Sequence, residues 1–137
     1  MSTYARRTQV PVSKSRMEIE QIVARYKADQ FGIATSSDKA MVQFRIASWT
    51  VRFILPLPRN DDQDRRQRWR ALCLIIKAKL ESVESKITTF ESEFLPHLVM
   101  PSGQTFGEWA VPQLEEMRES GKLPPIDMLA IEDRRGK

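Results

Sequence analysis

The sequence predicts a single α+β domain: an N-terminal helix, a three-stranded antiparallel meander, a long central helix and a short C-terminal helix. Three observations predict it. Apolar residues recur at alternating steps of four and three over residues 65–98, the spacing of a helix with one buried stripe. The period changes to two over residues 31–57, as in half-buried strands. A chain of 137 residues, 41% of them hydrophobic, is long enough for one core.

The first helix is expected to begin at Ser15. Ser15 and Glu18 match a capping box, in which each side chain bonds the backbone of the other residue. Residues 1–14 are basic and lack apolar periodicity, so we predict a flexible arm there. The helix is expected to end near Asp29, and its apolar face would consist of Ile19, Ile22, Val23 and Tyr26.

Three strands are expected between Phe31 and Leu57, joined by turns at Ser37-Asp38 and Ala47-Ser48. These turns set a register that places every large apolar residue on one face. Pro56 and Pro58 would end the third strand. In this register Phe31 opposes Phe44, Ile33 opposes Val42, Phe44 opposes Val51 and Ile46 opposes Trp49. The other face would carry Gln43, Arg45, Thr50 and Arg52, with Met41 and Ile54 beside them.

Residues 65–98 are predicted to form one long helix, capped by one of the aspartates at 61, 62 and 64. Thr88 and Thr89 are β-branched and lower helix propensity, so a kink at that point stays open. A four-three stripe is also what coiled coils use, so its end at Phe90 and Phe94 is a candidate contact with a second copy. The stripe consists of Trp69, Cys73, Ile76, Leu80, Val83, Ile87, Phe90 and Phe94.

A short extended piece and a turn at residues 101–104 should lead to a final helix. Thr105 and Glu108 match a second capping box, Pro112 would kink or divide the helix, and Gly121 would end it. The domain is therefore assigned to residues 15–125, and residues 126–137 are predicted to be a flexible tail. The side chains expected to point inward are Phe106, Trp109, Ala110, Leu114 and Met117.

The sequence lacks the usual signatures of an enzyme. It has no glycine-rich phosphate loop, no nucleophile elbow and no paired catalytic carboxylates, and the single His97 has no metal-ligand spacing around it. We therefore lean against catalysis and expect no cofactor and no metal. One cysteine, Cys73, allows no internal disulfide, and no stretch reads as a signal peptide or membrane span. A cytoplasmic protein without a membrane partner is expected.

The candidate binding site is a set of arginines. The net charge is only +4, but the basic residues are clustered, and the planar fork of arginine fits phosphate groups. The alternative is a solvated surface, or pairing with the nearby aspartates. The tryptophans at 49, 69 and 109 could stack on bases, but they lie on inward stripes, which favours core packing. The candidate nucleic-acid contacts are Arg45, Arg52, Arg66, Arg68 and Arg70.

The order helix, three antiparallel strands, helix over residues 15–85 resembles that of the double-stranded RNA-binding domain. In that family the basic N-terminus of the last helix contacts phosphates, and Arg65 to Arg70 occupy that place. The Lys-Lys-x-Ala-Lys motif and the glycine-rich lead of the family are absent, and three aspartates stand there instead. The resemblance implies phosphate contacts at the start of the long helix.

A second resemblance is carried by seven segments: 10–16, 26–31, 51–58, 66–72, 75–84, 87–94 and 107–109. Together they span most of residues 10–121 and resemble small proteins of tailed bacteriophages and prophages, a family without an established activity. That resemblance implies a phage or prophage origin and the cytoplasm of a host cell.

Together, these features predict a small non-enzymatic accessory protein that binds nucleic acid through arginines. The alternative is a protein–protein module that inhibits or adapts a host protein, and a homodimer is compatible with either.

Overall fold

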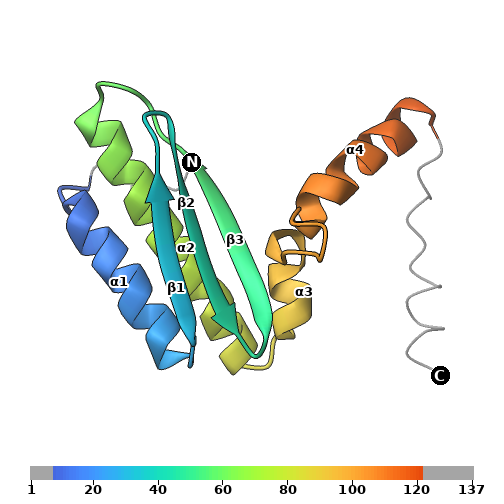
Figure 1. Ribbon diagram of the computed structural model, residues 1–137, viewed down its shortest axis with the longest axis horizontal. Helices are drawn as coiled ribbons and strands as arrows, with labels where there is room; N and C mark the ends of the chain where they lie inside the picture. Colours follow the sequence, from blue (N-terminus) through green and yellow to red (C-terminus); the bar gives the residue numbers. More distant parts are fainter. Residues whose placement is uncertain (1–7, 122–137) are drawn as a thin grey trace.

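The computed structural model describes residues 8–121, and it confirms the predicted α+β class. Helices α1 and α2 lie side by side on one face of the sheet, and the chain after α2 continues beyond the β3 edge (Figure 1). Residues 1–7 of the predicted arm and the predicted tail at 126–137 lie outside the described residues. The elements are α1 (Val12–Arg25), β1 (Gln30–Thr35), β2 (Lys39–Ile46), β3 (Trp49–Pro56), α2 (Asp62–Glu84), α3 (Phe90–Phe94), the 3-10 turn η1 (Leu95–His97) and α4 (Phe106–Glu119).

The three strands form an antiparallel meander in the order β1-β2-β3. The register is the predicted one: Phe44 pairs with both Phe31 and Val51, and the other two expected pairs are also present. Ala47 and Ser48 have φ angles of 51° and 70°, the left-handed conformation that a tight two-residue hairpin turn requires. Neither residue is a glycine or asparagine. The alternation of apolar residues was therefore enough to define the register without a strong turn signal.

The core lies between the sheet and the two long helices. Trp69 is 2% exposed, and the predicted stripe of α2 is buried as far as Leu80. Phe94 of α3 is fully buried and meets the rings of Phe44 and Phe53 edge-on at 6.2 and 6.4 Å between centroids. The core therefore includes a residue from beyond the end of α2.

Helix α1 begins at Val12, so the predicted capping box at Ser15 is wrong. The N-cap position is Pro11, and its side chain makes no capping hydrogen bond. Ser15 is fully buried inside the helix, and its hydroxyl has no hydrogen-bond partner within residues 8–121. Glu18 accepts a hydrogen bond from Arg70 of α2 at 2.8 Å instead of capping α1. The Glu18 carboxylate therefore forms an ion pair with a residue of another helix and does not take part in a capping box. The helix also ends early, at Arg25 rather than near Asp29.

The predicted single helix over residues 65–98 is wrong, because α2 ends at Glu84. Lys86 adopts a φ of 62°, which reverses the chain. Thr89 then begins α3, its hydroxyl accepting a hydrogen bond from the backbone N–H of Ser92 at 3.1 Å. The threonine that we read as a weak helix residue is a helix cap. The break turns Phe90 and Phe94 back onto the core, so they do not form a free stripe for a second copy.

Candidate functional site

The two sheet arginines lie on the outward face, and both are bound within the chain. Arg45 donates to both carboxylate oxygens of Asp29 at 2.9 and 2.7 Å. This pairing raises the pKa of Arg45 and lowers the pKa of Asp29. Arg52 donates to the side chain of Gln43 at 3.1 Å and to the carbonyl of Gly103 at 2.8 Å. Arg52 therefore fixes the 101–104 turn to β3.

The arginines at the start of α2 also have acceptors within the chain. Asp61 caps the helix as predicted, accepting from the backbone N–H of Asp64 at 3.0 Å. Arg68 lies 3.6 Å from the Asp64 carboxylate. Three arginines of α2 donate hydrogen bonds within or next to the connection between β3 and α2. Arg65 donates to the Pro58 carbonyl at 2.9 Å, Arg66 to the Gln63 side chain at 2.6 Å, and Arg68 to the Pro56 carbonyl at 3.0 Å. These bonds stabilise the connection.

Arg70 belongs to a cluster between α1 and α2. Its guanidinium donates to Glu18 at 2.8 Å, and the Cys73 sulfur lies 3.7 Å from the same Glu18 oxygen. The hydrogen bond from Arg70 is the main cause of the lowered pKa of Glu18. Burial raises the pKa of the Cys73 thiol, so the thiol stays protonated, as expected from its place in the apolar stripe. The cluster joins the two helices and offers no nucleophile.

The five candidate arginines do not form one surface. Arg45 and Arg52 extend from the outer face of the sheet, whereas Arg66, Arg68 and Arg70 belong to α2, which covers the other face. A phosphate backbone therefore does not meet all five on one flat platform. Nucleic-acid binding through them stays a prediction.

The three tryptophans have different environments. Trp69 is buried, with the Arg16 guanidinium 5.5 Å above its ring. The expectation of core packing is wrong for Trp49, which is 40% exposed and donates from Nε1 to Glu91 at 3.1 Å. It is also wrong for Trp109, which is 47% exposed.

Among residues 8–121, nothing buries the apolar face of helix α4. The expectation that this face points inward is wrong, because no residue of α4 is buried. Leu114 is 55% exposed and Met117 39% exposed. The helix projects away from the sheet, and Pro112 lies inside it without interrupting it (Figure 1). We call the following residues the α4 apolar face: Phe106, Trp109, Ala110, Leu114 and Met117.

The base of α4 is firmly held. Thr105 and Glu108 form the predicted capping box in full. The backbone N–H of Phe106 donates to the Leu98 carbonyl at 2.9 Å, and Leu98 itself bridges to β3. Gly107 packs so closely on η1 that a Cβ there would lie 2.8 Å from the Pro96 carbonyl oxygen. The exposed face is therefore presented from a fixed support.

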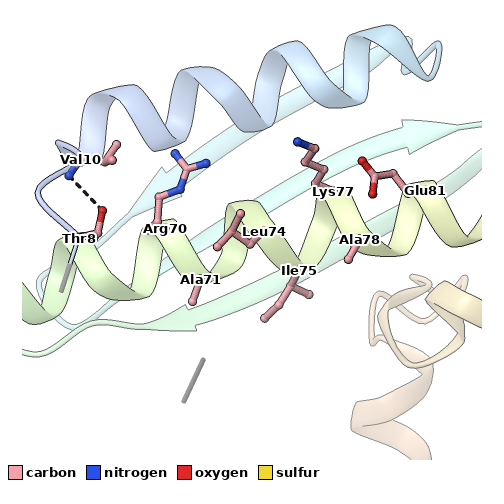
Figure 2. Close-up of a pocket in the computed structure, with 9 residues that line it drawn as sticks. All are labelled: Thr8, Val10, Arg70, Ala71, Leu74, Ile75, Lys77, Ala78 and Glu81. Carbon is pink, nitrogen blue, oxygen red and sulfur yellow. Dashed lines mark hydrogen bonds between the residues drawn. The ribbon is translucent and has the colours of Figure 1, made fainter. Parts of the chain in front are cut away.

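A shallow apolar groove runs along the solvent side of α2. In Figure 2, Ala71 and Ile75 point from α2 to the side away from α1, while Arg70 and Lys77 point toward α1. Two adjoining hollows share Ala71 and Ile75, and the second reaches β3 at Ile54 and Leu55. We call this surface the α2 groove; its lining includes Val10, Ile54, Leu55, Ala71, Leu74, Ile75, Ala78 and His97.

His97 lies at the end of this groove, where η1 meets the sheet. Its ring stacks on Phe53 with 4.1 Å between centroids. Burial is the main cause of its lowered pKa; the charge of Lys79 adds to the effect, and a hydrogen bond with the Arg52 backbone opposes it. The folded protein therefore favours the neutral imidazole.

The free energy of unfolding is expected to decrease as the pH falls from about 7.5 to about 5.5. The pKa of His97 is lower in the folded protein than in the unfolded chain, so the unfolded chain binds more protons. The stability that this difference contributes is fully present above the ordinary pKa of about 6.5 and is lost as the pH falls through the lowered pKa of the folded protein. The lowered pKa values of Glu18 and Asp29 act only at more acid pH. Urea titrations at the two pH values measure the change. In His97→Phe, which keeps an aromatic ring against Phe53, the dependence should flatten; an unchanged slope would contradict the assignment.

Within residues 8–121, no group of three or more histidine, cysteine, aspartate or glutamate side chains is placed to hold a metal ion. No helix in that range has both the length and the apolar content for crossing a membrane. Comparison of the chain with protein-family models, with curated proteins and with solved structures found no match.

Proposed function

We propose that this chain is a small non-enzymatic protein-binding module and that the α4 apolar face is its contact surface. The observation that supports this is the exposure of Trp109, Leu114 and Met117 on one side of an anchored helix. Aromatic residues and methionine are enriched where proteins meet, and an amphipathic helix is a common ligand for an apolar groove. The proposal includes a host protein as a candidate partner. It also keeps a phage or prophage origin and the host cytoplasm as the location.

The polar side of α4 favours a protein partner over a lipid surface. Helices that lie on membranes carry mainly lysine and arginine on their polar side. Here the polar side carries acidic residues, Glu108, Glu115 and Glu119, which anionic lipids would repel. The capping box and the packing of Gly107 also show that α4 is a well-formed element. Its exposed side chains are therefore available to a partner with an apolar surface.

The test is capture from an extract of host cells that also produce the untagged chain, with the full tagged chain, its Leu114→Glu variant and an Ile87→Glu control. Ile87 is 79% exposed and lies far from α4 in the chain, so the control adds the same charge at another exposed apolar position. We expect partners that the parent and the control retain and that Leu114→Glu loses, with unchanged thermal unfolding. A partner set that is identical for all three proteins, or empty for all three, would contradict the proposal.

Nucleic-acid binding is the second candidate, and one observation favours it. Lys14, Arg25 and Lys77 line a groove between α1 and α2, and none of them has an ion pair among the described residues. These groups are more available to phosphates than the paired arginines. Anisotropy with labelled DNA and RNA at two salt concentrations distinguishes the candidates, because phosphate contacts weaken steeply with salt. Lys14→Glu with Lys77→Glu should abolish such binding, whereas Leu114→Glu should leave it unchanged.

A further inference from the structure

We infer that the partner of the α4 apolar face is a second copy of this chain, whose α2 groove receives the helix. The inference rests on the proposed function and specifies its partner. It assigns a role to two apolar surfaces that residues 8–121 leave open, one on α4 and one on α2.

The two surfaces match in chemistry. The groove presents the aliphatic side chain of Ile75, which is 44% exposed, together with the small Ala71. Ile54, which is 51% exposed, lines the margin of the groove at β3. Leu114 and Met117 of α4 are aliphatic side chains of a size that such a groove accepts. Small residues in the floor let a helix approach closely, and larger ones at the sides provide contact area.

Their charges are also complementary. The segment from 106 to 119 contains four glutamates and one arginine, so α4 is acidic. The groove is bordered by Arg68, Arg70 and Lys77 with one acid, Glu81. Arg68 and Arg70 already pair within the chain, but Lys77 has no ion pair within residues 8–121. Opposite charges at the edge of an interface favour this pairing over an α4–α4 contact, which would oppose acid to acid.

Within residues 8–121, no other segment covers either of these surfaces. The element on which α4 packs extensively is η1, and Figure 1 shows α4 diverging from α2. The bonds that hold its base, including that of Phe106 to Leu98, keep it away from its own groove. A second copy supplies both missing parts at once. Two copies related by a twofold axis would form two equivalent helix-in-groove contacts, which is the usual closed symmetry of a homodimer.

The test is sedimentation velocity of the full chain over a concentration series from about 1 to 200 µM, a range that spans weak to moderate dimers. The variants are Leu114→Glu on α4, Ile75→Glu and Ile54→Glu in the groove, and Ile87→Glu as control. All four positions are exposed, so the fold should be retained, which circular dichroism checks. We expect the parent and the control to dimerise, and each of the other three to weaken dimerisation by at least about 30-fold, as for an interface hot spot.

A mixture adds a sharper readout. Leu114→Glu keeps an intact groove, and Ile75→Glu keeps an intact α4, so the two variants together should form a mixed dimer with one complete contact. Failure to form it at the highest concentration would overturn the inference. So would a monomeric parent, or a dimer that tolerates both groove variants. In those cases the capture experiment still decides the proposed function, because it does not require the second copy or the α2 groove.

Discussion

Replacing Phe94 by alanine is expected to lower the free energy of unfolding by about 3–5 kcal/mol. The side chain is fully buried, meets Phe44 and Phe53 edge-on, and stacks on Phe90 at 4.6 Å between ring centroids. The substitution therefore removes an aromatic ring and leaves a cavity between α3 and the sheet. Because Phe94 joins the segment after α2 to the core, η1 and the base of α4 should loosen together with it.

Urea unfolding followed by circular dichroism measures this loss, and Ile87→Ala is the matched control. Ile87 lies on the same predicted stripe, seven residues earlier, yet it is 79% exposed, so its substitution should change stability by less than about 0.5 kcal/mol. Equal losses in the two variants would mean that the chain after Glu84 continues as the straight helix that the periodicity predicts.

The sheet is the part of the fold that could be predicted in most detail. Side chains alternate between two faces with a period of two, so a slip by one residue would move every apolar side chain to the solvent. The pairs of Phe44 with Phe31 and with Val51 follow from that restriction alone. The helix break at residues 85–89 could not be predicted in this way, because Ile87 continues the apolar spacing although it is exposed. A period records which residues are apolar and does not record where the chain turns.

The ion pairs of the candidate arginines could not be predicted from the sequence either. Arg45 and Arg70 looked available because their acceptors are distant in the sequence: Asp29 is sixteen residues from Arg45, and Glu18 is fifty-two residues from Arg70. Backbone carbonyls, such as that of Gly103 for Arg52, leave no trace in a charge count. The α4 apolar face was recognised correctly as amphipathic, but an amphipathic pattern is the same for a core helix and for a helix that meets a partner. Only the placement of α4 separates these two cases.

Replacing Gly107 by alanine is expected to lower the free energy of unfolding by about 1–3 kcal/mol, the usual cost of overpacking. The new Cβ would lie 2.8 Å from the Pro96 carbonyl oxygen and 3.2 Å from its Cβ, so η1 or α4 must move. Helix propensity acts in the opposite direction, because alanine is about 1 kcal/mol more favourable than glycine within a helix. The sign of the measured change therefore tells whether the contact with η1 or the intrinsic preference dominates.

Gly32→Ala is the matched control, since no heavy atom lies within 4 Å of the position its Cβ would take. It should be neutral or slightly stabilising, because glycine weakens the interior of a strand. Hydrogen exchange should show faster exchange of the α4 amides in Gly107→Ala only. The variant leaves every side chain of the α4 apolar face in place and alters only how the helix is held. If dimerisation weakens in this variant, the partner contact depends on the fixed orientation of α4; an unchanged affinity would show that the helix docks independently of its support.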